Sequence, residues 1–122
     1  RIMHSIDKRM KESSNDPKNF LPTLTESNSP GERLAAIAKL QKFPNLDYLN
    51  WLANHVGDSE KPFIGYHATV ALYIASRSFG STNSKEIKNT LEKALLSIEN
   101  YKYKDPNQVK VINAALNELK IK

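Results

Sequence analysis

The densest group of chemically reactive side chains in this 122-residue sequence is the stretch HVGDSEK, residues 55–61. It places the imidazole of His55 close in sequence to a hydroxyl at Ser59 and to carboxylates at Asp58 and Glu60. Such groups could form a hydrolytic site, but a nucleophile, its base and the group that orients the base must meet around one substrate atom, which neighbours on a tight turn seldom do. We therefore favour a structural interpretation, in which the histidine complements a helix C-terminus, the glycine caps that helix, and Asp58 or Ser59 caps the next one.

No other pattern in the sequence points to catalysis. His4, His55 and His67 are not paired with one another or with a nearby acid at the spacing of zinc motifs, so we expect no metal site. The chain has no cysteine, which removes thiolate nucleophiles and disulfides, and its four glycines form no phosphate-binding loop. We therefore expect that the protein is not an enzyme and needs no cofactor.

Positive charge is the main compositional feature, and it lies at the ends of the chain. Lys and Arg number 18 against 13 Asp and Glu, which gives a net charge of +5 at pH 7. The excess lies in residues 1–20 and 101–122, without a basic stripe interleaved with aromatic residues. Because phosphate binding needs several cations that converge on one groove, a solvated surface is favoured. A nucleic-acid-binding face built from these basic terminal segments remains the alternative.

The longest uncharged run, Pro62 to Ala75, is shorter than the ~20 residues needed to cross a bilayer and is typical of a core helix. The chain begins at Arg1, and charges occur throughout its first residues, unlike those of a signal peptide. We therefore expect a segment of a larger, cytoplasmic protein, with no membrane span in this part.

Helix signals recur along the chain, and strand signals do not. Ser29, Pro30 and Glu32 form a capping box at the start of a helix predicted over residues 30–42. A second helix is predicted over about residues 45–57, and the short connection makes the two an antiparallel hairpin. Its apolar residues recur at the helical spacing i, i+3, i+4 and i+7: Leu49, Leu52, Ala53 and Val56.

The third helix is predicted over residues 62–79 and is apolar on nearly every side, which is typical of a helix surrounded by neighbours. Gly65 costs ~1 kcal/mol relative to alanine in a helix interior, so we expect it to allow close contact with a neighbouring helix. His67 is expected to be a neutral core histidine hydrogen-bonded to a loop carbonyl, with a ligand-binding or pH-sensing role as the alternative. Leu72 belongs to the predicted structural core with these two residues.

Two further helices complete the predicted domain. Asn83 and Glu86 form a second capping box before an amphipathic stretch, and the last helix begins near residue 105. We expect an N-terminal helix and loop over residues 1–29 and one compact helical-repeat domain over residues 30–122. The short N-terminal helix is marked by three hydrophobic residues, Ile2, Ile6 and Met10, and the loop after it contains three prolines.

Three of the predicted helices contain a similar short segment. Residues 35–40 read AAIAKL, residues 67–72 read HATVAL and residues 111–116 read VINAAL, so small residues precede a leucine in each. This pattern of antiparallel helix pairs resembles HEAT-like α-solenoid repeats. The resemblance implies an all-α fold of antiparallel helix pairs, which here number about five main helices plus the short N-terminal one. It also implies protein binding most often, with phosphopeptide or nucleic-acid binding in minority branches, and the phrase EKPFIGYHATVAL resembles helical modules of bacterial multidomain signalling or defence proteins.

The candidate partner-binding site is an aromatic stripe on the second predicted helix, beside its core face. Tyr48, Trp51 and His55 lie there at i, i+3 and i+7. The second helices of solenoid repeats commonly line the binding surface, and aromatic residues are the usual energetic anchors of interfaces. The alternative is that these rings only cover the adjoining helix. The sequence thus predicts a scaffolding or interaction module whose partner is another protein or another domain of the same chain, with nothing to indicate its oligomeric state.

Overall fold

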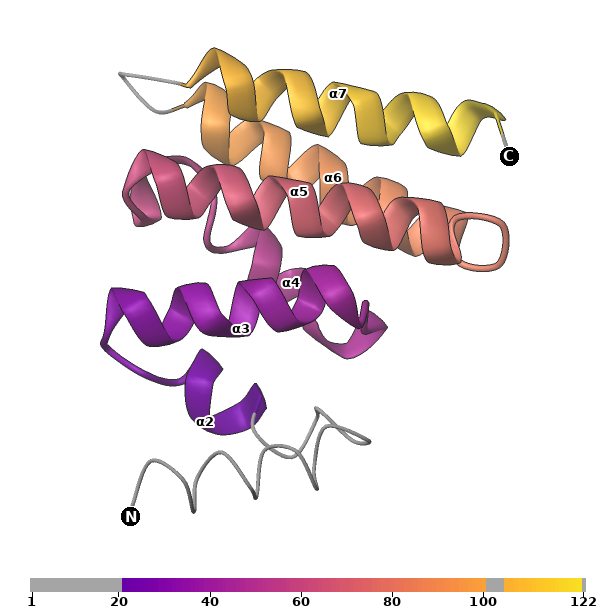
Figure 1. The fold of residues 1–122 in the computed structure, drawn as a ribbon. Helices are drawn as coiled ribbons and strands as arrows, with labels where there is room; N and C mark the ends of the chain where they lie inside the picture. The colour runs from indigo at the N-terminus through magenta and orange to yellow at the C-terminus, as the bar shows by residue number, and fades with distance from the viewer. Residues whose placement is uncertain (1–20, 101–104, 122) are drawn as a thin grey trace.

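The computed structural model describes residues 21–100 and 105–121, and within them the fold is all-α, as predicted (Figure 1). Two 3-10 turns, η2 (Leu46–Tyr48) and η3 (Gly57–Ser59), flank a short helix, and no strand occurs among the described residues. The six α-helices in this part of the chain are α2 (Leu21–Thr25), α3 (Pro30–Lys42), α4 (Leu49–Ala53), α5 (Pro62–Phe79), α6 (Ser84–Glu99) and α7 (Pro106–Ile121).

The longer helices form two layers. α3, α5 and α7 lie side by side and run in the same direction, and α4 and α6 lie behind them (Figure 1). The similar segments at residues 35–40, 67–72 and 111–116 therefore lie on three neighbouring helices of one layer. α5, in the middle of this layer, packs against both α3 and α7.

One apolar core joins the helices. Small residues such as Ala36, Ala68 and Ala115 are fully buried, which allows the helix axes to approach closely. Full burial of each larger apolar side chain stabilises the fold by about 1.5–3 kcal/mol. The largest buried side chains come from every described helix: Leu21, Ile37, Leu40, Leu49, Leu52, Leu72, Ile87, Leu91, Ile98 and Ile112.

The helix boundaries follow from local signals, although the predicted capping boxes form only in part. Ser29 Oγ accepts a hydrogen bond from the Glu32 backbone N–H at 3.4 Å, but the Glu32 carboxylate accepts one from Ser27 Oγ instead of reaching back to Ser29. The second capping box is wrong, because Asn83 makes no side-chain hydrogen bond to α6 and its Oδ1 accepts from Thr82 Oγ1 at 2.8 Å. α3 and α5 nevertheless span the predicted residues, since a proline sets the first turn of each.

The second predicted helix is wrong in length. Instead of one helix over about residues 45–57, the chain forms η2, the five-residue α4 and η3. Ser59 Oγ donates to the carbonyl oxygens of Asn54 and Val56 at 2.8 Å each, so a side chain replaces the backbone donors of a further helical turn. Gly57 has a φ of +70°, the left-handed conformation of a glycine that caps a helix, although this glycine begins η3 instead of capping a long helix.

Helix α2 lies in the segment that was predicted to be a loop. Leu21 is 2% exposed and belongs to the same core as the helices that follow it, although it precedes the expected domain boundary at residue 30. The short helix predicted from Ile2, Ile6 and Met10 lies outside the described residues.

Candidate functional site

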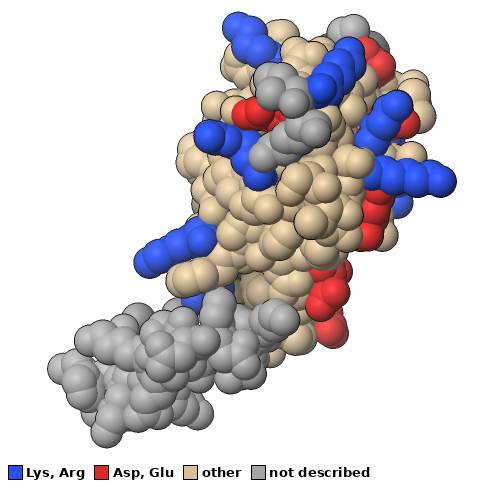
Figure 2. Space-filling view, turned by 90° about the vertical axis from the view of Figure 1, so that its right-hand side faces the viewer, with Lys and Arg blue, Asp and Glu red and all other residues tan. Residues whose placement is uncertain are grey.

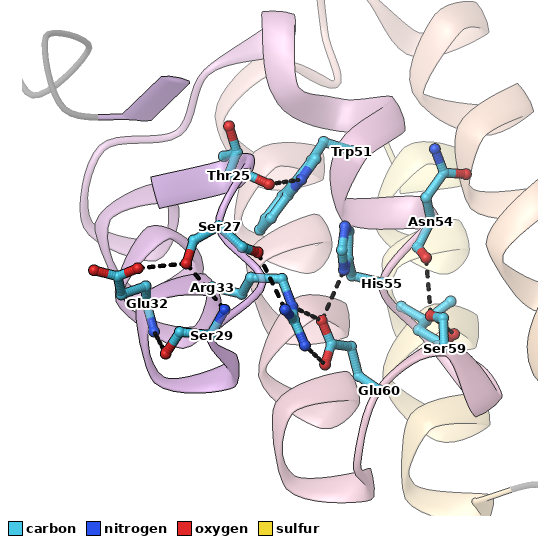
Figure 3. Close-up of polar contacts among 11 residues, drawn as sticks. Thr25, Ser27, Ser29, Glu32, Arg33, Trp51, Asn54, His55, Ser59 and Glu60 are labelled. Atoms are coloured by element: carbon cyan, nitrogen blue, oxygen red, sulfur yellow. Dashed lines mark hydrogen bonds and ion pairs between the residues drawn. The ribbon is translucent and has the colours of Figure 1, made fainter. Parts of the chain in front are cut away.

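Glu60, from the reactive stretch at residues 55–61, is a carboxylate whose side chain is 2% exposed. Arg33, on α3, donates to both of its oxygens, from Nε to Oε2 at 2.5 Å and from Nη2 to Oε1 at 3.0 Å. His55, just after α4, donates from Nδ1 to Oε2 at 2.8 Å (Figure 3). We call Arg33, His55 and Glu60 the Glu60 cluster. Because Arg33 Nη1 also donates to the carbonyl oxygen of Ser27 at 3.1 Å, the cluster joins separate parts of the chain.

The cluster holds Glu60 in its ionised form. Burial by itself raises the pKa of this carboxylate, but the hydrogen bonds from Arg33 and His55 together with their charges outweigh it, so the pKa of Glu60 lies below its ordinary value. The hydrogen bond to Glu60 in turn raises the pKa of the Arg33 guanidinium. Removing one partner of such a buried pair would leave the other charge uncompensated, so both charges contribute to the fold as a unit.

The geometry of the cluster is that of a structural ion pair and not that of a catalytic triad. A histidine oriented by a carboxylate is one part of a triad, but the hydroxyl of Ser59 donates to backbone carbonyls and not to His55. The imidazole also lies against the indole ring of Trp51, with ring centroids 4.2 Å apart. The helix cap predicted at Asp58 or Ser59 is wrong, because α5 begins after Lys61 without a side-chain hydrogen bond to its first turn.

The predicted partner-binding stripe, Tyr48, Trp51 and His55, is half-buried and makes contacts within the protein. Trp51 Nε1 donates to the carbonyl oxygen of Thr25 at 3.1 Å and so connects α4 to α2 (Figure 3). Tyr48 packs against the core, and burial, followed by the charges of nearby carboxylates, raises the pKa of its phenol. These are contacts of the kind expected if the rings cover adjoining helices.

Gly65 lies in close contact with α7, which confirms the contact predicted for this glycine. A Cβ atom added there would lie 2.7 Å from Nε2 of Gln108. Gln108 is itself 1% exposed, and its Oε1 accepts a hydrogen bond from the backbone N–H of Gly57 at 2.9 Å. The buried amide therefore joins α7 to η3 and fits against α5 because residue 65 has no side chain. No sequence pattern indicated this role of Gln108, because its partner lies 51 positions away in the chain.

His67 lies at the edge of the core and not within it. The residue is half-buried, and its Nδ1 is 3.2 Å from Nε2 of Gln41, whose amide also donates to the His67 carbonyl oxygen at 2.9 Å. The predicted hydrogen bond to a loop carbonyl is therefore wrong, since the partner is a side chain on α3. Phe63 packs edge-on against the imidazole, with ring centroids 4.6 Å apart. Leu72, by contrast, is 1% exposed.

An exposed aromatic pair at the start of α5 is a feature that the sequence pattern did not indicate. Phe63 is 63% exposed and Tyr66 is 37% exposed, and we call these two residues the aromatic ridge. The prediction that neighbours surround this helix on nearly every side is therefore wrong for its first turns. The periodic apolar pattern contains no information about which side a neighbouring helix leaves open.

A groove lies on each side of the aromatic ridge. The groove toward α3 has a volume of about 230 Å³ and is lined by Phe63 together with Leu34, Ala38, Gln41 and His67. The groove toward α7 has a volume of about 430 Å³ and is lined by both ridge residues together with Pro62, Asp105, Asn107, Lys110 and Val111. The ridge therefore separates two hollows that could each receive a side chain.

Metal-binding groups and membrane spans are two further features that could indicate a function. Within residues 21–100 and 105–121, no three His, Cys, Asp or Glu side chains are grouped so that they could hold a metal ion. Among the helices described, none has the length and apolar character needed to cross a membrane. Comparisons of the chain with models of protein families, with curated proteins and with solved structures found no match.

Proposed function

We propose that this chain is a protein-interaction module that binds a segment of another protein, or of another domain of the same chain, across the aromatic ridge. The observation that carries the proposal is the 63% exposure of Phe63, which lies between two grooves. Full burial of such a ring contributes about 1.5–3 kcal/mol of stabilising free energy, and a ring that stays exposed to water lacks part of it. A partner that covers the ridge recovers this free energy.

The surroundings of the ridge match the anatomy of a small interface. Aromatic residues are enriched among those that dominate binding energy, and they contribute most where surrounding contacts exclude water. The two grooves offer apolar surface at Leu34 and Val111 and polar groups at Asn107 and Lys110. A segment that lies across α5 can place one side chain in each groove and bury Phe63 between them.

The arrangement of the helices supports a HEAT-like architecture as part of this proposal. The three similar segments lie on the parallel neighbours α3, α5 and α7, and the stacked helices of repeat proteins form continuous binding surfaces. The ridge belongs to this layer, whereas the stripe of Tyr48, Trp51 and His55 is centred on α4. The stripe is the weaker candidate, because Trp51 and His55 use polar atoms in hydrogen bonds within the protein.

Nucleic-acid binding is the less supported function. Its expected basis was the basic residues 1–20 and 101–122, and residues 1–20 lie outside the described part of the chain. The charged residues that line the two grooves beside the ridge are Asp105 and Lys110, whereas a phosphate backbone needs several converging cations. Protein binding therefore ranks first.

Site-specific photocrosslinking in the source cells tests the proposal. Phe63→p-benzoylphenylalanine places the crosslinker on the ridge. Leu96→p-benzoylphenylalanine is the matched control, because Leu96 is 61% exposed on α6 and lines neither groove. We expect a discrete protein adduct from position 63 and none from position 96. Tyr66→Ala should weaken that adduct while the circular dichroism stays that of the folded protein, because Tyr66 is outside the buried core.

The outcomes of this experiment separate the possible functions. If position 63 gives no adduct, or if both positions give the same adducts, the ridge is ordinary exposed surface and the proposal is wrong. If the adduct contains nucleic acid and no protein, the alternative function replaces it.

A further inference from the structure

A third groove, of about 790 Å³, lies between α6 and α7, and we call it the α6–α7 groove. It is separate from the aromatic ridge, since neither Phe63 nor Tyr66 lines it. The residues that line it combine lysine side chains with aliphatic ones: Lys85, Lys88, Leu116, Leu119 and Lys120.

Positive charge dominates the α6–α7 groove. Lys85, Lys88 and Lys120 line it together with a single carboxylate, that of Glu92. Within the part of the chain that the structure describes, none of these three lysines forms an ion pair. Figure 2 views the molecule from the end where α7 terminates, and it shows several Lys and Arg side chains projecting there. The groove therefore has an excess of positive charge that is open to an acidic partner.

The apolar surface of the groove indicates which acidic partner fits. Leu116 and Leu119 are half-buried, and the methylene stems of the lysines add to the apolar area beside them. An amphipathic helix with apolar side chains on one face and carboxylates at its edges matches both features. A nucleic acid matches them less well, because single-strand binding grooves present aromatic rings for base stacking and none of the described residues that line this groove is aromatic.

We infer that the α6–α7 groove binds an acidic amphipathic helix of a partner protein. The α6 residues that line the groove run from Ser84 to Glu92, so a partner helix would contact the groove over about 12 Å, or about two helical turns. The lysines attract the acidic edge of this helix, and Leu116 and Leu119 cover its apolar face. The inference does not rest on the function proposed for the aromatic ridge, because the two surfaces share no lining residue.

Titration of fluorescein-labelled helical peptides into the full chain, followed by fluorescence anisotropy, tests the inference. One peptide carries leucines along one face and glutamates at the flanking positions, and the other has lysine in place of every glutamate. We expect saturable binding of the glutamate peptide and at least about tenfold weaker binding of the lysine peptide. Raising the salt concentration from about 50 mM to about 300 mM should weaken the binding of the glutamate peptide several-fold, because salt screens exposed charges.

Charge reversal locates the binding site. Lys88→Glu should weaken the binding of the glutamate peptide by about fivefold, because an attractive contact becomes repulsive. Lys93→Glu is the matched control, since it makes the same charge change at an exposed position of α6 that does not line the groove. We expect it to change the affinity for the glutamate peptide by less than about twofold. Both variants should retain the circular dichroism of the wild type, because both lysines are exposed.

Three results would overturn the inference: no binding of the glutamate peptide, equal binding of both peptides, or equal effects of Lys88→Glu and Lys93→Glu. If a single-stranded oligonucleotide binds more tightly than the glutamate peptide, and if Lys88→Glu abolishes that binding, the groove is a nucleic-acid site instead. These variants leave Phe63 unchanged, so a negative result here does not affect the crosslinking test of the ridge.

Discussion

Arg33 and Glu60 form the buried ion pair whose loss should reduce stability most clearly. Replacing Arg33 by methionine removes two hydrogen bonds to a carboxylate whose side chain is 2% exposed. Breaking a buried pair from one side costs about 3–5 kcal/mol, because the remaining charge is poorly solvated. Since His55 still donates to Glu60, we expect Arg33→Met to cost about 3 kcal/mol, at the lower end of this range.

Glu60→Gln removes the charge with little change in shape. Hydrogen bonds to charged groups contribute about 1.5–3 kcal/mol and neutral ones about 0.5–1.5 kcal/mol, so we expect a loss of about 1–2 kcal/mol. The Arg33 side chain is 17% exposed and can be hydrated when its partner is neutral. The double variant buries no unpaired carboxylate, so its loss should be smaller than the sum of the two single losses by at least about 1 kcal/mol.

Urea unfolding at about pH 7, followed by circular dichroism, measures these losses. Arg77→Met is the matched control. Arg77 Nε lies 3.5 Å from Glu118 Oε1, but the Arg77 side chain is 64% exposed, so its loss should cost less than about 1 kcal/mol. A loss of less than about 1 kcal/mol for Arg33→Met, or strict additivity in the double variant, would refute the reasoning.

The acid dependence of stability tests the sign of the Glu60 contribution. Burial works to raise the pKa of Glu60, but Arg33 and His55 bring it below its ordinary value of 4.5 in the folded protein. The unfolded state therefore binds more protons near this pH, so the stabilisation is present above pH 4.5 and is lost as the pH falls through the lower folded value. Between about pH 5 and about pH 3, Glu60→Gln should lose less stability than the wild type. Parallel pH profiles of the two proteins would contradict an ionised, stabilising Glu60.

Three further substitutions, each followed by urea unfolding, test other buried contacts. Gly57→Ala should cost about 1–2 kcal/mol, because a Cβ atom is unfavourable at a φ of +70°; an unchanged midpoint would contradict this. In Gly65→Ala, the added Cβ atom displaces the Gln108 amide and leaves the Gly57 N–H unpaired. The unpaired N–H costs about 1–3 kcal/mol, which exceeds the about 1 kcal/mol that alanine gains over glycine in helix propensity, so the variant should be less stable than the wild type. In the Gln108→Ala background the same change should be neutral or stabilising, and an equal loss in both backgrounds would disprove the contact. Trp51→Phe should cost about 1 kcal/mol through the lost hydrogen bond to Thr25, and no change would show that this bond contributes nothing.

Helices α3 and α5 could be predicted from the sequence because local interactions determine their ends. Pro30 and Pro62 each set a first helical turn, and both helices end next to residues that disfavour continuation, α3 at Lys42 before Pro44 and α5 at Phe79 before Gly80. The end of α4 could not be predicted in this way. The carbonyls of Asn54 and Val56, which follow α4, accept hydrogen bonds from Ser59, and this contact depends on the path of the chain after the helix.

The polar contacts of the candidate site could not be predicted, because their partners are far apart in sequence. Arg33 lies 27 positions from Glu60, and Gly57 lies 51 positions from Gln108. Glu60 appeared in the sequence only as one charge among several in a turn, with nothing to indicate burial. The exposure of Phe63 also could not be predicted from the sequence. A helix that is apolar on most sides has the same sequence pattern whether or not a neighbouring helix covers each side.

The buried polar contacts also bear on the aromatic ridge, because they fix the chain on both sides of it. Glu60 precedes Phe63 by three residues and is held by Arg33 before α5 begins, while Gly65 follows Phe63 by two residues and lies against the buried amide of Gln108. Buried polar contacts whose partners are satisfied add rigidity to a packed core and specify one arrangement of its helices. Binding costs free energy when side chains and backbone segments must be ordered, and a ridge on a backbone already fixed on both sides avoids the backbone part of that cost. The Glu60 cluster would thus strengthen binding at the ridge without contacting the partner.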